Sequence, residues 1–228
     1  MRKAFLFDLD GTLIDSMPHH HDAWVEWHVR RGLEMDVGGF FASTAGRSNG
    51  EILADMFPEL AVAEHEAMAD EKETIYRTRA ARSLALIRGA QAFVERSRAQ
   101  GIALAVCTAA TPENMALAFE RHGIDRWVQT VVSPADGLRG KPHPDIFLEA
   151  ARRIGVAPQH CIVFEDAPLG IEAARRAGMH AVALTTTLPA SAFAEYSNVL
   201  TVHADFASLD PQALLTLPPA PTKEQHHA

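Results

Sequence analysis

The sequence predicts an α/β fold in which a parallel sheet is combined with a separate, all-helical segment. From residue 84 onward, apolar strand-like runs alternate with helical segments, which is typical of βαβ units. Residues 15–83 instead indicate helix and loop throughout, and they follow a first strand near residue 5. A chain of 228 residues with 47% hydrophobic content is long enough for a sizeable core and a smaller module. We therefore predict a core from residues 1–14 and 84–217, with residues 15–83 inserted after the first strand.

The first strand is an apolar run that ends at Asp8 and Asp10, followed by Gly11. In open α/β sheets, ligands bind at the carboxyl ends of the strands. The two carboxylates point to the same side of an extended strand and therefore need a cation between them. Mg²⁺ is the natural candidate, because it is a hard ion that takes oxygen ligands. The alternative is an Asp-rich turn that only starts the next segment.

The inserted segment is expected to begin with a helix from residue 17 to about residue 32, because four large side chains share one stripe of it. These side chains are His20, Trp24, Trp27 and Arg31. Residues 36–50 contain four glycines and are predicted to form a loop. Helical character resumes over residues 51–57 and 64–82.

The remaining elements alternate, and glycines at residues 101, 123 and 178 directly follow expected helices. Helices are predicted over residues 89–100, 112–122, 145–154 and 170–177, and near 207–216. Strands are predicted over residues 102–107, 128–133, 161–164, 181–184 and 199–202. The tail, residues 218–228, is rich in proline and polar residues and is predicted to be disordered.

Composition excludes several classes of function. A net charge of −8 argues against a nucleic-acid or anionic-membrane surface, because both need concentrated Lys and Arg. No apolar stretch approaches the roughly 20 residues that a membrane span needs, and we expect no signal peptide. Cys107 and Cys161 each lie in an apolar run, which favours buried thiols over a disulfide. We therefore expect a cytoplasmic monomer that binds neither nucleic acid nor membrane.

Reactive side chains follow four of the predicted strands. They are Asp8 and Asp10, then Thr108, then Lys141 in its loop, then Glu165 and Asp166. Together they would supply a carboxylate nucleophile, an acid–base partner, phosphate-binding donors and metal ligands, which is what phosphoryl transfer requires. Taken singly, Lys141 could be a solvated loop lysine, and Glu165-Asp166 a charge pair at a helix N-terminus.

These motifs resemble those of the haloacid dehalogenase (HAD) superfamily. The matching residues are Asp8-Leu-Asp10-Gly-Thr12, Thr108, Gly140-Lys141-Pro and Glu165-Asp166. The helical insertion resembles the small cap of the branch that contains β-phosphoglucomutase and sugar-phosphate phosphatases. The resemblance implies a Rossmann-like, three-layer core with a mobile helical cap, and a small phosphorylated metabolite as the binding partner.

The resemblance also implies roles for the motif residues. Asp8 would be the nucleophile that forms an aspartyl phosphate, and Asp10 the general acid and base. Mg²⁺ would be held by Asp8, the main-chain carbonyl of Asp10, and Asp166, with Glu165 acting directly or through water. The phosphoryl oxygens would be bound by Thr108, the backbone around Ala109, and Lys141.

In the inserted segment, the same resemblance implies that four residues reach the substrate: His20, Gly46, Arg47 and Lys72. A closing cap would carry these groups over a dianionic substrate and exclude water. The plainer alternatives are that His20 is a core histidine on the tryptophan stripe, and that Lys72 is a solvated helix residue.

In this family branch, a phosphatase and a phosphosugar mutase would both form an aspartyl phosphate. They differ in the group that accepts the phosphoryl moiety, which is water in the phosphatase and a sugar-phosphate hydroxyl in the mutase. Where the mutase carries Ser-Lys to hold a second phosphate, this chain has Ala110-Thr111-Pro112, which lacks that cation. We therefore predict a Mg²⁺-dependent phosphatase acting on a sugar phosphate or similar phosphomonoester, with a phosphosugar mutase as the alternative. A catalytically inactive binding module is disfavoured, because Asp8 and Lys141 are both present.

Overall fold

The centre of the molecule is a six-stranded parallel sheet, seen in a computed structural model that describes residues 3–44 and 47–217. The strands follow the order β3-β2-β1-β4-β5-β6. Their bounds are β1 Ala4–Phe7, β2 Ala103–Cys107, β3 Thr130–Val132, β4 Cys161–Glu165, β5 His180–Leu184 and β6 Val199–His203. The order reverses between β1 and β4, and such a switch point is where doubly wound sheets bind ligands. This confirms the predicted α/β fold with a Rossmann-like parallel sheet.

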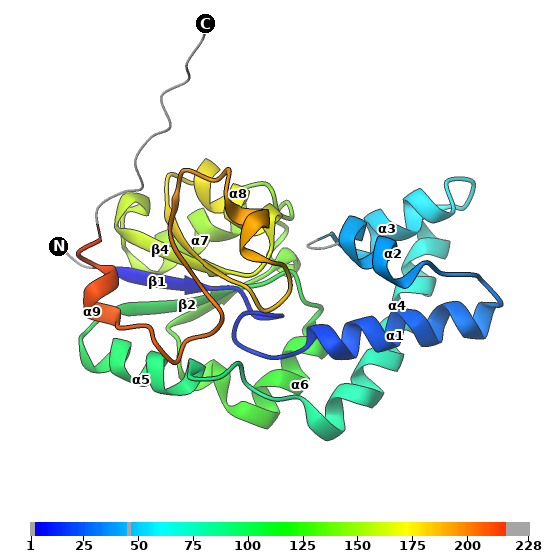
Figure 1. Ribbon diagram of the computed structural model, residues 1–228, viewed down its shortest axis with the longest axis horizontal. Helices are drawn as coiled ribbons and strands as arrows, with labels where there is room; N and C mark the ends of the chain where they lie inside the picture. Colours follow the sequence, from blue (N-terminus) through cyan, green and yellow to red (C-terminus); the bar gives the residue numbers. More distant parts are fainter. Residues whose placement is uncertain (1–2, 45–46, 218–228) are drawn as a thin grey trace, which may run out of the picture.

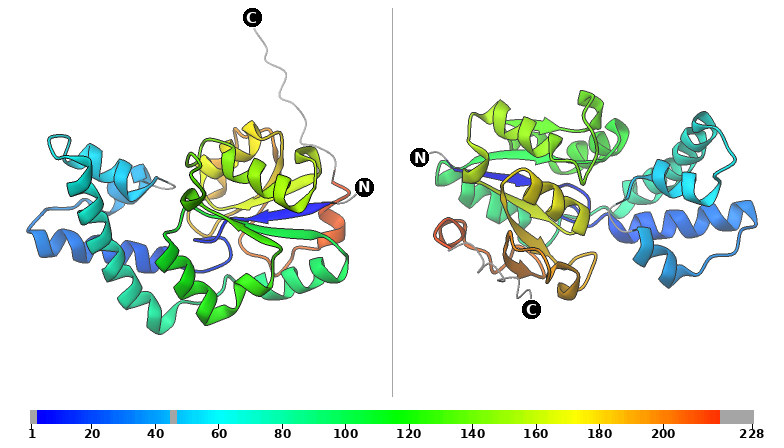
Figure 2. Two further views of the ribbon diagram at one scale, coloured as in Figure 1. Left: turned by 180° about the vertical axis from the view of Figure 1, so that it is seen from behind. Right: turned by 90° about the horizontal axis from the view of Figure 1, so that it is seen from above.

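Alternating side chains of the strands build a hydrophobic core on each face of the sheet. Phe5 and Phe7 belong to the cluster on one face, whereas Leu6 belongs to the cluster on the other. Phe7 stacks on Phe164 of β4 with ring centroids 4.8 Å apart. The first face is covered by α5 (Ala90–Ala99), and the second by α7 (Asp145–Ile154) and α8 (Pro168–Arg176). Figures 1 and 2 show the resulting three layers.

Four helices, which we call the cap, lie to one side of these layers (Figure 1). They are α1 Met17–Arg31, α2 Val37–Thr44, α3 Asn49–Met56 and α4 Val62–Ser83. Helices α1 and α4 pack along each other around the buried side chains of Trp27 and Tyr76. The rest of the described chain, which we call the core, adds α6 (Pro112–His122), α9 (Pro211–Leu214) and 3₁₀ turns at Ile124–Arg126, Pro134–Asp136, Pro158–His160 and Ala190–Phe193.

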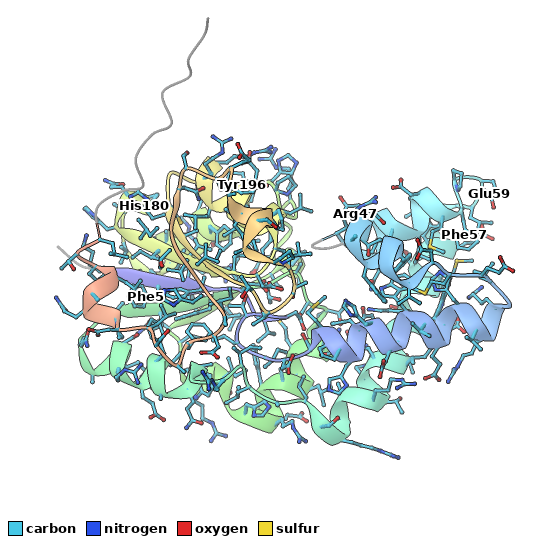
Figure 3. All side chains as sticks on the ribbon, viewed as in Figure 1. Phe5, Arg47, Phe57, Glu59, His180 and Tyr196 are labelled. Atoms are coloured by element: carbon cyan, nitrogen blue, oxygen red, sulfur yellow. The ribbon has the colours of Figure 1, made fainter. Side chains whose placement is uncertain are left out.

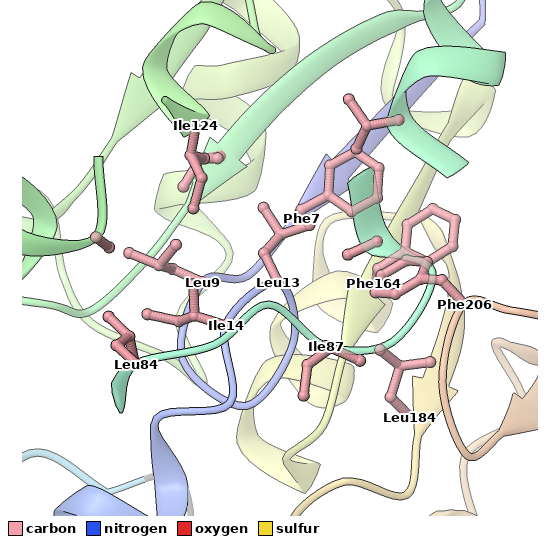
Figure 4. Packing of buried hydrophobic residues seen from close by; sticks show 14 of the residues in the cluster. Phe7, Leu9, Leu13, Ile14, Leu84, Ile87, Ile124, Phe164, Leu184 and Phe206 are labelled. Atoms are coloured by element: carbon pink, nitrogen blue, oxygen red, sulfur yellow. The ribbon is translucent and has the colours of Figure 1, made fainter. Parts of the chain in front are cut away.

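Two connecting segments join the cap to the core, and they run side by side. The Asp15 backbone N–H donates to the Ala85 carbonyl at 2.9 Å, and the Ile87 N–H donates to the Leu13 carbonyl at 2.9 Å. Leu13, Ile14 and Leu84 are buried together beneath the strand ends (Figure 4). The prediction of a separate, mobile cap with boundaries at residues 15 and 83 stays a proposal, supported by this arrangement.

The predicted loop over residues 36–50 is wrong, because this stretch contains α2 and the start of α3. Phe40 packs against Trp24 with ring centroids 5.3 Å apart, and Phe41 stacks on His21 at 3.8 Å. Tertiary packing of these rings outweighs the low helix propensity of Gly38 and Gly39. The last helix is also shorter than predicted: α9 spans only Pro211–Leu214 and begins after the Asp210 cap.

Other features follow the sequence-based expectations. Helix α1 ends at Gly32, which adopts φ 65°, and α6 ends at Gly123, which adopts φ 67°. Cys107 and Cys161 are both buried free thiols, as predicted. No helix in the described ranges is long and apolar enough to cross a membrane. The predicted disordered tail, residues 218–228, lies outside the described residues.

Candidate active site

The carboxyl end of β1 places Asp8 beside the end of β4. The Asp8 backbone N–H donates to the Phe164 carbonyl at 3.0 Å, so the ladder continues up to the aspartate. The chain then turns at Gly11, which has φ 73°. A Cβ atom on Gly11 would lie 2.1 Å from Oδ2 of Asp166. Glycine at this position therefore allows the backbone turn and the close approach of the second carboxylate.

Three buried carboxylates meet at this point. One oxygen each of Asp8, Glu165 and Asp166 lies within 4.8 Å of the others, an arrangement that can hold a metal ion. Oε2 of Glu165 accepts hydrogen bonds from the backbone N–H groups of Asp166 and Ala167, both at 3.0 Å. Gly170 in α8 makes room for this side chain, because a Cβ there would lie 1.8 Å from Oε1 of Glu165.

Hydroxyl groups hold the third carboxylate of this cluster. Oδ1 of Asp166 accepts a hydrogen bond from the Thr12 hydroxyl at 3.3 Å, and Oδ2 accepts one from the Thr187 hydroxyl. Thr12 belongs to the first motif, whereas Thr187 lies in the loop after β5. Both hydroxyls orient the carboxylate without neutralising it.

Lys141 is the cation within this cluster. Its Nζ lies 2.5 Å from Oδ1 of Asp8 and 2.6 Å from Oε1 of Glu165. Burial opposes the charge of this lysine, but the two carboxylates outweigh it and raise the Lys141 pKa. Burial raises the Asp8 pKa, and burial together with Glu165 raises the Asp166 pKa to about 7. Two of the three carboxylates thus pair with the Lys141 ammonium and the third has only hydroxyl partners among its side-chain contacts, so the donor set fits a hard divalent cation.

The Asp10 side chain has different neighbours and takes no part in the carboxylate cluster. Its Oδ1 lies 3.5 Å from Nε2 of His20, and Nδ1 of His20 lies 2.7 Å from Nζ of Lys72. The His20 ring also stacks on Tyr76 with centroids 3.8 Å apart. Burial alone would raise the Asp10 pKa, but hydrogen bonding and charge from His20 lower it. When the lysine donates to Nδ1, the other ring nitrogen presents its N–H to Asp10.

A cavity of about 370 Å³ opens over these groups, between the core and the cap. Its walls include all the sequence-predicted site residues that the structure describes: Asp8, Asp10, His20, Arg47, Lys72, Thr108, Ala109, Lys141, Glu165 and Asp166. Thr108 is buried, and its Oγ1 accepts a hydrogen bond from the Ala110 N–H at 3.0 Å. Gly46, the remaining predicted residue, lies outside the described residues.

Arg47 lies at the end of the cap nearest the core, far from Phe57 and Glu59 at the opposite end (Figure 3). Its guanidinium forms an ion pair with Asp55 at 2.6 Å and donates to the Glu51 carbonyl at 3.2 Å. Arg47 therefore borders the cavity with its charge already matched by a carboxylate of the cap.

The sequence analysis missed three polar residues that line the cavity: Asn49, Glu73 and Asn114. Oε1 of Glu73 accepts hydrogen bonds from Nδ2 of Asn49 at 2.5 Å and from Lys72 at 2.9 Å. Oε2 of Glu73 accepts one from Nδ2 of Asn114 on α6 at 2.6 Å. In the sequence these are ordinary polar residues on helices, and no motif brings them together. Gly170 in α8 and Thr187 in the loop after β5 also line the cavity and were missed, because neither belongs to a recognised motif.

The fold and the site together define an α/β enzyme in which a buried aspartate, a lysine and a cluster of carboxylates converge at the switch point of a parallel sheet.

 A sequence model of the haloacid dehalogenase-like hydrolases matches residues 2–178. The chain therefore belongs to the haloacid dehalogenase-like hydrolase family, as its motifs predicted.

Several relatives of this chain are named as phosphatases. Hexitol phosphatase A of Escherichia coli K12 is 36% identical over 191 residues, which cover 80% of this chain and 82% of that protein. Fructose-1-phosphate phosphatase YqaB of the same organism is 34% identical over 183 residues, covering 78% and 94%. Validoxylamine A 7'-phosphate phosphatase of Streptomyces hygroscopicus subsp. limoneus is 33% identical over 195 residues, covering 86% and 91%.

Solved structures show the same architecture over nearly the whole chain. A HAD hydrolase of family IA, variant 3, from Entamoeba histolytica superposes with a TM-score of 0.86 at 27% identity, covering 93% of this chain and 97% of that one. β-Phosphoglucomutase from Clostridium difficile gives a TM-score of 0.78 at 25% identity, covering 94% and 96%.

Proposed function

We propose that this protein is a Mg²⁺-dependent phosphatase that hydrolyses a sugar phosphate or a similar small phosphomonoester through an aspartyl phosphate on Asp8. The observation that carries the proposal is the convergence of Asp8, Asp10 and Lys141 at one cavity, beneath a cap that supplies His20. Membership of the family and the names of the relatives support the same reaction class.

The proposed chemistry divides the work between the two aspartates. The Asp8 carboxylate attacks phosphorus, and the bond to the leaving oxygen breaks while Asp10 gives that oxygen a proton. Water then attacks the aspartyl phosphate, Asp10 takes a proton from it, and inorganic phosphate is released. Lys141, the Thr108 hydroxyl and nearby backbone N–H groups bind the phosphoryl oxygens as negative charge develops on them.

The carboxylate cluster fits a magnesium ion. Asp8, Glu165 and Asp166 offer oxygen ligands within one small volume, and their charge exceeds that of Lys141. When bound, the ion would neutralise charge between the nucleophile and the phosphoryl group. The raised Asp8 and Asp166 pKa values support this assignment, because they indicate a site where negative charge is unfavourable without a further cation.

The surroundings of residues 110–112 favour water over a second sugar phosphate as the acceptor. Ala110 and Thr111 line the cavity, but Oγ1 of Thr111 is occupied as the N-cap of α6, where it accepts from the Asn114 N–H at 3.3 Å. No cation comes from this segment, whose residues are Ala, Thr and Pro. The mutase alternative therefore has no specific support here.

The test is phosphate release from a panel of phosphomonoesters in the presence of Mg²⁺, run beside an isomerisation assay with β-glucose 1-phosphate and a bisphosphate primer. We expect hydrolysis of hexitol and sugar monophosphates and no isomerisation. Asp8→Asn, purified in the same way, controls for contaminating phosphatases. Isomerisation without net phosphate release would establish the mutase, and failure to hydrolyse any ester, including acetyl phosphate, would overturn the proposal.

A further inference from the structure

The wall of the cavity contains a hydrogen-bonded group of three polar side chains, Asn49, Glu73 and Asn114, which we call the Glu73 cluster. Asn49 and Glu73 come from the cap, whereas Asn114 comes from α6 of the core. Glu73 and Asn114 are each only 4% exposed. A buried carboxylate in this position joins the two parts of the molecule across the cavity.

The cluster retains hydrogen-bonding capacity of both kinds. A carboxylate offers about four acceptor positions, and Glu73 uses three of them, for Asn49, Lys72 and Asn114. Asn114 donates one amide hydrogen to Glu73, and its Oδ1 accepts a hydrogen bond from Arg77 at 3.2 Å. Asn49 likewise donates one amide hydrogen to Glu73. Within the described residues, the second amide hydrogen of Asn49 and its Oδ1 have no protein partner. The free groups are thus a mixture of donors and acceptors.

The lysine and arginine side chains that line this cavity already form ion pairs with carboxylates. Among the described lining residues, Lys72 pairs with Glu73 at 2.9 Å, and Arg47 pairs with Asp55 at 2.6 Å. Lys141 is bound by the carboxylates at the strand ends. Only the phosphoryl site would gain further positive charge, from the magnesium ion. Among the lining residues that the structure describes, the cap side of the cavity thus presents acceptor oxygens and amides without an unmatched lysine or arginine.

We propose that the Glu73 cluster is a subsite that binds hydroxyl groups on the uncharged polyol part of the substrate and disfavours a second phosphate group. A hydroxyl group both donates and accepts, so it can use the free acceptors and the free amide hydrogens together. A phosphate group only accepts, and it would face the Glu73 carboxylate with its own negative charge. This inference rests on the proposed phosphatase function and specifies its substrate as a monophosphate of a polyhydroxylated carbon chain.

The cluster also links recognition to the position of the cap. Asn114 can hydrogen-bond Glu73 only while α6 and α4 lie against each other, so the subsite is complete only in this arrangement. Apolar side chains of Trp24, Phe41 and Ile52 line the same cavity and can pack against the carbon skeleton. A polyol that bridges the cluster would favour the arrangement in which the catalytic groups face the substrate.

The experiment compares substrates that share a phosphate and a carbon chain length. We expect kcat/KM for glucitol 6-phosphate to exceed that for n-hexyl phosphate, which has no hydroxyls, and that for glucitol 1,6-bisphosphate, in each case by roughly 10²-fold or more. Equal values for glucitol 6-phosphate and either comparison substrate would overturn the subsite. If acetyl phosphate and p-nitrophenyl phosphate are not hydrolysed either, the proposed function itself has failed.

Variants separate the subsite from the chemistry. Asn114→Leu should lower kcat/KM for glucitol 6-phosphate at least about tenfold more than it lowers kcat/KM for acetyl phosphate, which has no polyol part. Asn49→Lys, at a partly exposed position, should raise the ratio of bisphosphate to monophosphate kcat/KM at least about tenfold, whereas Asn49→Gln should not. Thermal melts establish that each variant is folded, and if Asn114→Leu does not fold, the Asn49 pair decides. An unchanged ratio in Asn49→Lys would count against the proposal.

Discussion

Asp8 and Asp10 are two residues apart in the chain, but the structure surrounds their carboxylates with different groups. Asp8 lies 2.5 Å from the Lys141 ammonium and beside two further carboxylates. Asp10 faces His20, which is held in turn by Lys72. The first environment suits a nucleophile that shares a cation, and the second suits a group that exchanges protons.

Replacing each aspartate by asparagine should therefore have different consequences. Asp8→Asn removes the attacking carboxylate, so no phosphoenzyme should form and turnover should be abolished. Asp10→Asn keeps the nucleophile but cannot activate water, so turnover should fall by about 10²–10⁴-fold while a phosphate adduct accumulates on Asp8. Rapid-quench mass spectrometry with acetyl phosphate measures both outcomes. An adduct on another residue would show that these roles are assigned wrongly.

Gly170 provides a second test at the scale of a single atom. A methyl group there would meet the Glu165 carboxylate at 1.8 Å, so Gly170→Ala should displace that carboxylate or shift α8. We expect a loss of about 1–3 kcal/mol in unfolding free energy and a fall in kcat/KM of at least about tenfold. Denaturant unfolding and steady-state kinetics measure the two effects. Gly38→Ala is the matched control, since its nearest atom lies 3.9 Å away. Equal behaviour of the two variants would contradict the steric argument.

At the scale of elements, the strands were easier to predict than the cap. Apolar runs such as residues 103–107 and 161–165 are buried completely and need no partner information to be recognised as strands. Helix α2 was missed because its glycines suggest a loop, and only the contacts of Phe40 and Phe41 with α1 explain why it is helical. Local pattern cannot predict contacts between distant segments.

The same reason explains which parts of the site were missed. The HAD motifs fall at strand ends, so parallel topology alone brings Asp8, Lys141 and Glu165 to one edge of the sheet. The Glu73 cluster depends instead on how α4 packs against α6, and the sequence carries no periodic signal for that contact. Pairings such as Arg47 with Asp55 likewise became visible only in the structure.

The buried Glu73 at the contact between α4 and α6 should make the unfolding free energy depend on pH. Burial alone would raise the Glu73 pKa, but Lys72, His20 and the two asparagines lower it to about 2. A carboxyl pKa that is lower in the folded state adds stability above the unfolded value, near 4.5, and loses it as pH falls toward 2. Glu73→Gln should therefore destabilise the protein by roughly 3 kcal/mol at pH 7, and by progressively less below pH 4.5.

Urea unfolding at a series of pH values measures this difference. Glu66→Gln, an exposed position on the same helix, is the matched control and should change the unfolding free energy by less than about 0.5 kcal/mol throughout. A destabilisation by Glu73→Gln that stays constant from pH 7 to pH 3 would contradict the assignment of a charged, hydrogen-bonded Glu73.

The end of α4 is fixed by the core. Arg121 of α6 donates hydrogen bonds to the carbonyls of Leu84 at 2.6 Å and Ala81 at 3.1 Å, close to the point where the chain leaves the cap. A cation at a helix C-terminus also complements the helix dipole. Arg121→Ala should lower the unfolding free energy by about 0.5–1.5 kcal/mol, because the Ala81 carbonyl loses this donor and the Leu84 carbonyl keeps only His122 as a side-chain partner. Arg126→Ala, on the core surface, is the comparison in thermal melts, and equal losses would argue against a specific role for Arg121.

At the scale of the whole molecule, the cavity exists because the sheet edge and the cap face each other across two adjacent connecting segments. The core contributes the carboxylates and Lys141, and the cap contributes His20, Lys72 and Glu73. Under the proposed function, the reacting carboxylates and Lys141 belong to the core, whereas Asn49 and Glu73 of the proposed subsite belong to the cap. We therefore expect a change at Asn49 to alter which substrate is preferred more than it alters the reaction itself.

Removing divalent cations tests whether the stability and the activity of the protein depend on a metal ion bound at the carboxylate cluster. With Asp8, Glu165 and Asp166 close together and one lysine among them, Mg²⁺ should bind the folded state and stabilise it. At a concentration about 100 times the dissociation constant, binding adds about 2.7 kcal/mol, which corresponds to a rise in Tm of about 5–10 °C. Chelator should abolish phosphate release and remove this rise, and added Mg²⁺ should restore both. Differential scanning calorimetry and a phosphate-release assay on the same samples measure the two effects.

Two controls make the metal prediction specific. Ca²⁺ is larger and less exacting in its geometry, so it should raise Tm by occupying the carboxylates and yet fail to support turnover. Asp166→Asn removes one ligand without changing the volume of the side chain, and it should lose most of the Mg²⁺-dependent rise in Tm. The two readouts are needed together, because activity alone cannot distinguish a cation bound at this cluster from one that arrives with the substrate. Full activity in chelator, or a Tm of the wild-type protein that Mg²⁺ does not change, would show that the three carboxylates do not form a cation site.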